Sequence, residues 1–336
     1  MLRKAGEGIM GKKLALIGAA VLLFYSLCRA PADGERDILS PARTEAVPVG
    51  KLTDSGGETD TTPLIQAPAS APEEDEESYF TPSGADMAVA MTIGSTVMLR
   101  NETGYSVDAD AIAQAGTPIR LASEGPQILI IHTHSSEAYT PSGLDRYEPS
   151  DNARTEDADY NIIRVGDELT RLLERAGLQV IHDRGVYDYP SYAGSYSRSG
   201  AAVEQYLRDY PSISVVLDVH RDALGTDGVI YKTVAEENGT CASQVMLLAG
   251  TDESGLEHPR WRDNLSLALY LQRAIFQTYP TLMRPVALVP QRYNQQLCPG
   301  MLILEVGSSG NTLQEALAAI RLFAAAAAPA LLALVE

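Results

Sequence analysis

The chain has 336 residues, of which 45% are hydrophobic, and it carries a formal net charge of −18 at pH 7. This apolar content is enough to fill a sizeable core, which excludes a wholly disordered chain. The charge argues against a nucleic-acid partner, because phosphate contacts need clustered Lys and Arg and the chain has 26 of these against 44 Asp and Glu.

A basic and then apolar N-terminal segment, residues 1–30, predicts export from the cytoplasm. Several basic residues precede the uncharged run LALIGAAVLLFYSLC, Leu14 to Cys28. The run is shorter than the ~20 residues of a typical spanning helix, so a cleaved signal peptide and a short membrane anchor both remain open. The rest of the chain is expected on the extracytoplasmic side of the cell membrane, or secreted if the leader is cleaved.

The composition changes after this leader. Residues 31–90 are rich in Pro, Ser, Thr, Gly and acidic residues without sustained periodicity, which predicts a disordered acidic linker. Residues 91–336 are predicted to form one folded domain, which contains the motifs described below. Short apolar alternation from Thr92 to Asp108 indicates one or two hairpins at the edge of this domain.

The domain then alternates between predicted strands and helices. Six apolar runs predict strands, at residues 127–132, 178–182, 213–219, 228–234, 244–248 and 301–306. Helices are predicted at 161–177, at 260–280 and in an alanine-rich C-terminal segment that Asn311 would open, with Gln314 three residues later. A charge and a proline interrupt that last segment, which favours a core helix over a second membrane span. This order predicts an α/β fold with a mixed, mostly parallel sheet and helices on both faces.

Polar side chains with metal-binding chemistry lie at the ends of three predicted strands. The motif HTHSSE contains His134 and Glu137, VVLDVHRDA contains His220, and LILEVGSSGN contains Glu305. Ligands gather at the carboxyl ends of strands in open α/β sheets. Two imidazoles and a carboxylate are the usual donors to a catalytic zinc ion that keeps one position open for water. The sequence therefore predicts a Zn²⁺ site built from separate strands.

Three further features have open interpretations. Glu305 extends an apolar strand, where a carboxylate is seldom buried without a partner or a metal, so we expect a functional role for it. Cys241 and Cys298 are expected outside the cytoplasm, where a disulfide between them remains open. The segment DYPSYAGSYSRS has tyrosines and serines suited to binding sugars, although a plain structural loop explains it at least as well.

Five motifs in a fixed order carry a resemblance to a known family. HTHSSEAY, YNIIRVGDEL, DYPSYAGSYSRS, YPSISVVLDVHRDA and LEVGSSGNTLQEAL together resemble stage II sporulation protein P, a family of peptidoglycan hydrolases in endospore-forming bacteria. The similarity extends from about Val97 to the C-terminus. The family looks like a divergent branch of the zinc-dependent N-acetylmuramoyl-L-alanine amidases, which implies an amidase-like fold.

The resemblance implies a role for each candidate residue. His134 and His220 correspond to two histidine ligands of zinc, and Glu305 corresponds to the catalytic glutamate. The other ligand in the amidases is a glutamate shortly before the first helix, where this chain offers Asp157. Glu137 is the alternative ligand.

The neighbours of His220 have two interpretations. Arg221 and Asp222 could orient the metal ligands through hydrogen bonds, a role that metal sites commonly need. A surface ion pair is equally consistent with the sequence.

An amidase of this kind cleaves the bond between the lactyl group of N-acetylmuramic acid and L-alanine, and the sporulation family is also credited with cutting peptide cross-links. The resemblance implies action during forespore engulfment, with stage II sporulation proteins D and M as partners and the N-terminal segment in the membrane. Two alternatives stay open: a zinc endopeptidase that acts only on stem peptides, and a non-catalytic scaffold that binds peptidoglycan.

Overall fold

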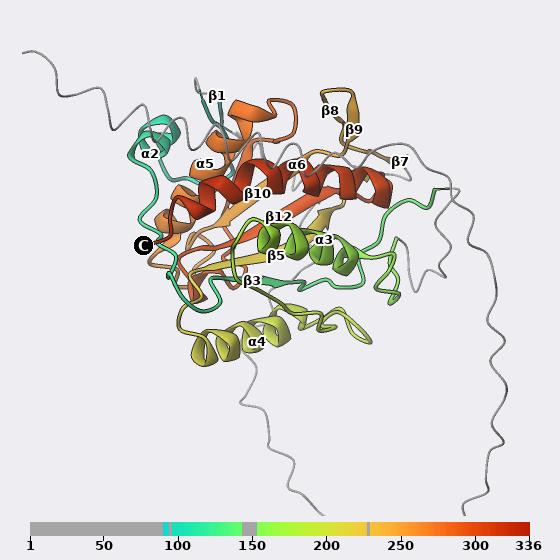
Figure 1. Cartoon of the computed structure of the whole chain (residues 1–336), viewed down its shortest axis with the longest axis horizontal. Coiled ribbons are helices and arrows are strands. Elements are labelled where there is room, and N and C mark those ends of the chain that lie inside the picture. Colours follow the sequence, from blue (N-terminus) through green and yellow to red (C-terminus); the bar gives the residue numbers. More distant parts are fainter. Residues whose placement is uncertain (1–89, 94–95, 143–152, 227–228) are drawn as a thin grey trace, which may run out of the picture. The chain divides into compact units, whose positions relative to one another are not determined.

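A mixed sheet of eight strands forms the centre of the described part of the chain, which in this computed structural model comprises residues 90–93, 96–142, 153–226 and 229–336 (Figure 1). The predicted leader and linker lie outside these residues, apart from Ala90. The sheet has the order β1-β2-β11-β10-β12-β5-β3-β4. Its strands are β1 (Ala90–Ile93), β2 (Met98–Asn101), β3 (Ile128–Ile131), β4 (Val180–His182), β5 (Val215–Asp222), β10 (Val245–Gly250), β11 (Val286–Val289) and β12 (Met301–Ser308).

Most neighbouring strands in this sheet are parallel. The pairs β2–β11, β11–β10, β12–β5, β5–β3 and β3–β4 are parallel, whereas β1–β2 and β10–β12 are antiparallel. Every residue of β3, β5, β10 and β11 is buried, as expected of strands with both faces covered. The predicted mixed, mostly parallel sheet is confirmed. The antiparallel pair β1–β2 lies at its edge, where a hairpin is predicted.

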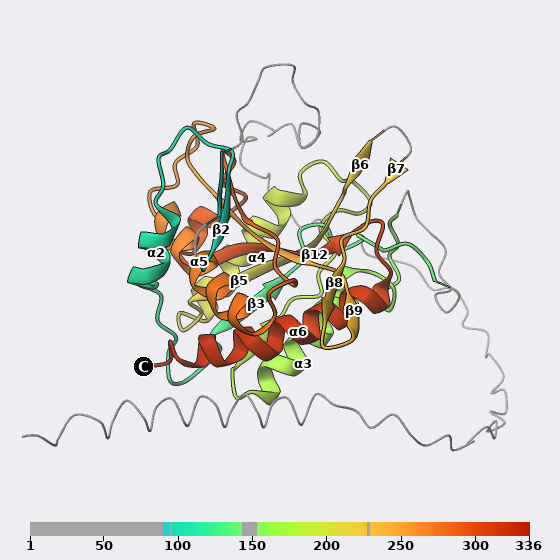
Figure 2. The same ribbon diagram turned by 90° about the horizontal axis from the view of Figure 1, so that it is seen from above.

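Helices cover both faces of the sheet, as predicted. The helices α3 (Ile162–Arg175), α5 (Trp261–Thr278) and α6 (Leu313–Leu332) pack on one face, and α4 (Ser195–Asp209) lies on the other (Figures 1 and 2). A short helix, α2 (Ala109–Ala115), packs against α5. The main core therefore lies between the sheet and α3, α5 and α6, and a smaller core lies under α4.

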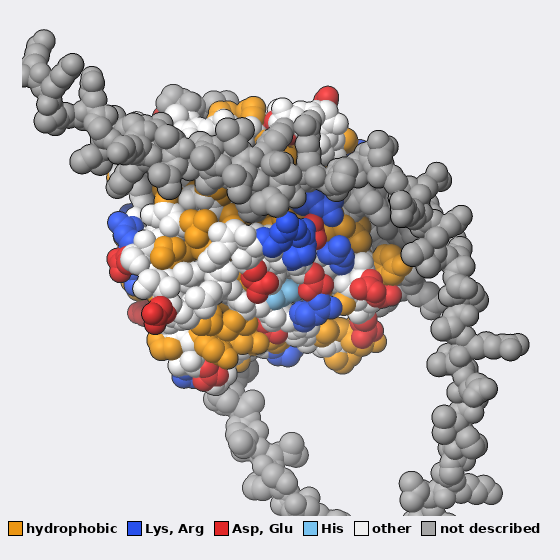
Figure 3. All heavy atoms as spheres, viewed as in Figure 1, with side chains coloured by type: hydrophobic (Ala, Val, Ile, Leu, Met, Phe, Trp, Pro, Cys, Tyr) orange, Lys and Arg blue, Asp and Glu red, His pale blue; other side chains and the backbone are white. Residues whose placement is uncertain are grey.

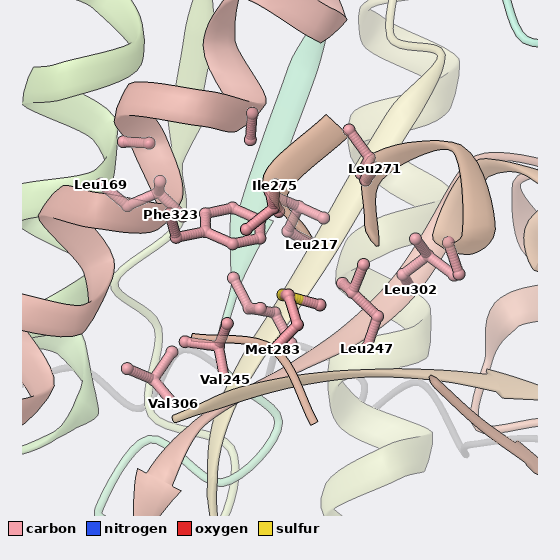
Figure 4. Packing of buried hydrophobic residues seen from close by; sticks show 14 of the residues in the cluster. Leu169, Leu217, Val245, Leu247, Leu271, Ile275, Met283, Leu302, Val306 and Phe323 are labelled. Carbon is pink, nitrogen blue, oxygen red and sulfur yellow. The ribbon is translucent and has the colours of Figure 1, made fainter. Parts of the chain in front are cut away.

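Side chains from the strands and the helices meet in the main core (Figure 4). Successive strand residues point to opposite faces, so Leu217, Leu247 and Leu302 all lie on this side of the sheet. They belong to the same cluster as Leu169 of α3 and Phe323 of α6. Burying a side chain of this size contributes about 1.5–3 kcal/mol, so this layer is a major source of the stability of the fold.

The helix α3 has the boundaries that the sequence predicts. Asn161 caps its first turn by accepting a hydrogen bond from the Ile163 N–H at 2.9 Å. Gly177 lies just beyond its last turn with φ +103°, in the left-handed region that favours glycine. The apolar positions that define its predicted inner face are all buried: Ile162, Val165, Leu169, Leu172 and Leu173.

The helix α6 is capped by Thr312 and not, as predicted, by Asn311. The Thr312 side chain accepts from the Glu315 N–H, and the Glu315 carboxylate accepts from the Thr312 N–H. Asn311 instead binds both backbone groups of Thr233. Among the described residues, α6 is the one helix long and apolar enough to cross a membrane. It packs against α3 and α5, and half of that apolar stretch is buried, in agreement with the predicted core helix.

Acidic and basic side chains are interleaved on the outer face that carries α3 and α6 (Figure 3). Glu168 of α3 pairs with Arg321 of α6 at 2.7 Å and with Arg171 of its own helix at 2.8 Å. Burial alone would raise the pKa of Glu168, but the two guanidinium groups lower it to about 2. The ionised carboxylate therefore links the two helices at the surface.

Several elements differ from the prediction. The strand expected at 228–234 is reduced to β7 (Val229–Ile230), which forms a hairpin with β6 (Gly225–Thr226). The strand expected at 213–219 starts later, at Val215, and continues to Asp222. A second small hairpin joins β8 (Ala235–Glu237) and β9 (Thr240–Ala242). The helix α4 and the strand β11 have no counterpart in the prediction.

Both cysteines outside the leader are free thiols. Cys241 is exposed on β9, whereas Cys298 is buried in the smaller core under α4. Burial raises the pKa of Cys298 to about 11, which keeps this thiol protonated and unreactive. The two residues do not form the disulfide that the sequence left open.

His132, the first histidine of the HTH motif, lies beneath α3 and pairs with His182 of β4. Its Nδ1 is 2.8 Å from the Val219 carbonyl oxygen, and its Nε2 is 2.8 Å from His182 Nε2. Burial lowers the pKa of His132 to about 3, so the ring is neutral. Because a carbonyl only accepts, Nδ1 carries the proton and His182 donates to Nε2. A Cβ at Gly166 of α3 would lie 2.4 Å from His132 Nε2 and 2.6 Å from His182 Nε2.

We predict that Gly166→Ala destabilises the fold, although alanine is the better helix former. Overpacking typically costs about 1–3 kcal/mol, which outweighs the roughly 0.5–1 kcal/mol that alanine gains over glycine within a helix. Urea unfolding would measure the change. In a His132→Ala background the closest clash is absent, so the cost of Gly166→Ala should shrink. An equal cost in both backgrounds would contradict a steric origin.

Candidate active site

Four candidate residues gather at the carboxyl edge of β3, β5 and β12. His134 and Glu137 lie in the turn after β3, His220 lies in β5, and Glu305 lies in β12 directly opposite His220 in the strand register. Val219 and Leu304, the residues just before His220 and Glu305, pack into the main core. Because alternate strand residues point to opposite faces, His220 and Glu305 project to the face that carries α4.

His220 lies between two carboxylates. Its Nδ1 is 3.5 Å from Glu137 Oε2, and its Nε2 is 2.9 Å from Asp218 Oδ1 in a charge contact without hydrogen-bond geometry. Burial would lower the pKa of His220, but Asp218 and then Glu137 outweigh burial and raise this pKa well above its usual value. Asp218 is itself fixed by Thr133, whose N–H and hydroxyl donate to it at 2.8 and 2.6 Å. His220 is thus held with Nδ1 facing Glu137.

Glu137 is buried by a tight turn in which its N–H donates to the His134 carbonyl at 3.1 Å. Its Oε2 accepts a hydrogen bond from the Arg221 N–H at 3.0 Å, and its Oε1 lies 3.8 Å from Arg154 Nη2. Burial would raise the pKa of Glu137, but the contacts with His220 and Arg221 lower it far below its usual range. The side chain is therefore a charged carboxylate beside His220, as a metal ligand would need to be.

His134 is enclosed by aromatic rings and hydroxyl groups. Its Nε2 is 3.0 Å from Tyr192 Oη, and its Nδ1 is 3.4 Å from Ser195 Oγ. The His134 ring stacks on Tyr192, with centroids 4.4 Å apart, and meets the His220 ring edge-on at 5.2 Å. Burial and then the charge of His220 lower the pKa of His134 to about 4, so this imidazole is neutral.

Arg154 and Asp188 form a frame around the turn after β3. Arg154 Nη1 donates to Asp188 Oδ2 at 2.8 Å, and the same carboxylate accepts from the hydroxyls of Ser135 and Ser136 at 2.9 and 2.6 Å. Sequence reasoning does not identify Arg154, because it follows no recognisable element. Asp188 begins the motif DYPSYAGSYSRS, and that motif is the signal by which this frame and Tyr192 could have been found.

Arg221 and Asp222 are buried and do not form the surface ion pair that was one interpretation of the sequence. Arg221 donates to the carbonyls of Ala138 and Ala153 at 2.7 and 2.8 Å, which fixes the segments on either side of the site. Asp222 instead pairs with Arg284 at 2.6 Å. Both residues support the site, and neither contacts His134.

Asp157, predicted as a metal ligand from the family pattern, is not brought into this cluster. Its side chain is exposed, and its Oδ1 accepts a hydrogen bond from the Asp159 N–H at 3.0 Å in the turn before α3. The alternative carboxylate, Glu137, is the one that lies beside His220. The short turn after His134 places Glu137 there, whereas Asp157 belongs to the solvent-facing approach to the helix.

Glu305 has a buried carboxylate oxygen, Oε2, without a hydrogen-bond partner in the described structure. Burial and then the nearby charge of Asp222 raise the pKa of Glu305 to about 8. A buried polar atom without a partner is costly and uncommon in folded proteins. Such an atom, near His220 and the carboxylates of Asp222 and Glu137, makes Glu305 a candidate functional residue.

The imidazole and carboxylate groups of His134, Glu137 and His220 are of the kinds that bind zinc. The distance between Glu137 Oε2 and His220 Nδ1 also suits two ligands of one zinc ion. Bonds of about 2.0–2.1 Å at a tetrahedral angle place two ligand atoms ~3.4 Å apart, close to the 3.5 Å between Glu137 Oε2 and His220 Nδ1. Both nitrogens of His134, the third donor, face hydroxyl groups. Accordingly, within the described ranges no three His, Cys, Asp or Glu side chains are already arranged around a metal position.

Comparison with known proteins places this chain in a family. The sequence model of stage II sporulation protein P matches residues 58–328. The chain belongs to this family. Stage II sporulation protein P of Bacillus subtilis (strain 168) is 27% identical over 218 residues, which are 60% of this chain and 50% of that protein. The match therefore spans about half the length of this curated relative.

The solved structures that match part of this chain include several N-acetylmuramoyl-L-alanine amidases. AmiC2 of Nostoc punctiforme is 15% identical and covers 63% of this chain and 98% of its own, with a TM-score of 0.36. Ami1 from Mycobacterium smegmatis is 14% identical, covering 64% and 98%, with a TM-score of 0.37. The amidase from Clostridium difficile 630 is 15% identical, covering 62% and 97%, with a TM-score of 0.36.

We predict that Glu305→Gln stabilises the metal-free protein at neutral and alkaline pH. In the unfolded chain Glu305 loses its proton near pH 4.5, whereas in the folded protein its pKa is raised to about 8. Between these two pH values the folded state must either hold a proton or carry an unfavourable charge, so the wild type loses stability as the pH rises through this range. Glutamine mimics the protonated form and avoids this loss. The variant should gain more than about 1 kcal/mol at pH 8 and nothing at pH 4. Thermal unfolding after chelation would measure both, and a pH-independent difference would contradict the prediction.

Proposed function

We propose that the chain is a peptidoglycan hydrolase of sporulation that cleaves the amide between N-acetylmuramic acid and L-alanine. The observation that carries this proposal is the convergence of His134, Glu137, His220 and Glu305 at one edge of the sheet, where the Oε2 atom of Glu305 is buried and lacks a hydrogen-bond partner. Membership in the stage II sporulation protein P family supports the same substrate.

In this proposal His134, Glu137 and His220 hold a zinc ion. When bound, zinc supplies Lewis acidity toward the scissile carbonyl and lowers the pKa of its water to ~7. Glu137 takes the ligand position that the family pattern gives to Asp157, because Glu137 is buried beside His220. Asp218 contributes by fixing the orientation of the His220 ring, so that Nδ1 faces Glu137.

Glu305 acts as the acid–base group. A pKa raised to about 8 leaves the carboxyl group able to hold a proton or release it near neutral pH, the range in which proton transfer is most effective. Its carboxylate form takes a proton from the attacking water, and its acid form gives a proton to the leaving amine nitrogen. The apolar neighbours of Glu305 in the sheet, Met246 and Ile303, keep the group poorly solvated.

The metal ligands can be tested by substitution. His134→Ala, Glu137→Ala and His220→Ala should each lose most of the bound zinc, because the two ligands that remain make a much weaker site. Asp157→Ala is the matched control and should retain zinc. Metal analysis of the purified proteins would decide. Loss of zinc from Asp157→Ala but not from Glu137→Ala would reverse the assignment of the carboxylate ligand.

The acid–base role can be tested with Glu305→Gln on purified sacculi. The variant should fold and keep its zinc, while its turnover should fall by about 10² to 10⁴-fold, the usual contribution of an acid–base group. Glu236→Gln, a change of the same kind at an exposed strand position, should digest sacculi normally. Normal digestion by Glu305→Gln would rule out this mechanism.

The products of the same digestion identify the bond. New amino groups on L-alanine indicate the amidase, whereas new amines only within stem peptides or cross-links indicate the endopeptidase alternative. Binding of sacculi without any new amine would leave the scaffold alternative.

We further propose that the domain works outside the cytoplasm, attached to the membrane through its leader, together with stage II sporulation proteins D and M.

A further inference from the structure

Tyr192 lies directly over His134. It belongs to the connection between β4 and α4, in the motif DYPSYAGSYSRS. Its ring is stacked on the imidazole with the two planes 13° apart and the centroids 4.4 Å apart. Its hydroxyl lies 3.0 Å from His134 Nε2. One side chain therefore covers a face of the predicted metal ligand and brings its hydroxyl close to one of the ligand's nitrogens.

The burial of the two rings shows which of them faces solvent. Tyr192 is 40% exposed, whereas His134 is 5% exposed. The other nitrogen of His134 faces Ser195 Oγ, and Tyr196 meets the imidazole edge-on at 5.4 Å. Among the described residues, Tyr192 is thus the outermost of these groups around His134.

Tyr192 is also connected to the opposite side of the site. The guanidinium carbon of Arg154 lies 4.7 Å from the centre of its ring, within the range of a cation–π contact. Arg154 in turn binds Asp188 and approaches Glu137. These contacts link the exposed ring to the frame that Arg154 and Asp188 form around the turn after β3.

We propose that Tyr192 is a displaceable cap on His134, and that a divalent metal ion entering the site competes with the Tyr192 hydroxyl for Nε2. The inference rests on the proposed function for the identity of the ion, but the cap itself is a property of the metal-free chain. This cap explains why Glu137 and His220 lie at the spacing of zinc ligands while His134, the third donor, is covered. The metal affinity of the site is then set partly by the hydroxyl that must leave.

The cap can be tested without any metal. Diethyl pyrocarbonate modifies exposed neutral imidazoles, and peptide mass spectrometry locates the modified histidine. His134 should react severalfold faster in chelated Tyr192→Ala than in the wild type. Tyr189→Ala, which removes an exposed tyrosine from the same connection, should leave the rate unchanged. Equal rates in the wild type and Tyr192→Ala would show that Tyr192 does not cover His134, and would overturn the proposal.

Competition for Nε2 is tested with Tyr192→Phe, which keeps the ring and removes the hydroxyl. The lost hydrogen bond is of ordinary strength, so zinc should bind about two- to tenfold more tightly. Tyr189→Phe is the control and should bind like the wild type. Unchanged or weaker binding by Tyr192→Phe would mean that the hydroxyl supports the metal-bound state, contrary to the proposal. If neither the wild type nor any variant binds zinc, the proposed function fails, while the modification rates still decide whether Tyr192 covers His134.

Discussion

The contact of His220 with Glu137 and Asp218 is the interaction on which the rest of the site depends. All three side chains are buried, and an isolated charge in such a place would be strongly unfavourable. They are compatible with folding because each compensates the others and because backbone N–H groups of Thr133 and Arg221 donate to the two carboxylates. Removing His220 would leave two buried carboxylates without the imidazolium that lies between them. The stability of the main core is what allows this arrangement to persist.

The parallel sheet determines which residues can take part. The strands β3, β5 and β12 are neighbours, and the register pairs Ile131 with Asp218 and His220 with Glu305. Successive side chains of β5 point to opposite faces of the sheet. Asp218 and His220 therefore both point away from the main core, and the carboxylate and the imidazole lie on the same face. The two histidines of the HTH motif separate for a related reason. His134 lies in the turn that follows β3, whereas His132 turns under α3 to meet His182.

Much of this could be predicted from the sequence because the signals are local. Apolar runs identify β3, β5, β10 and β12, and the cap and glycine around α3 mark its ends. The polar residues at the ends of those runs identify His134, His220 and Glu305. The helix α4 was missed because it starts after Gly194 without a side-chain cap and contains a glycine and several serines, which are poor helix signals. The choice between Asp157 and Glu137 depends on a turn and on contacts with β5, which spacing along the chain does not show.

The site combines fixed and adjustable parts, which come from different kinds of structure. Asp218, His220 and Glu305 lie within strands, where neighbouring strands hold Asp218 and Glu305 on both sides and β12 holds His220 on one side. The groups around His134 come from connections: the turn after β3 and the segment between β4 and α4. Connections lie at the surface and adjust more readily than strands. Any rearrangement that admits a ligand should therefore occur around Tyr192 and His134, while the spacing of His220 and Glu305 stays constant.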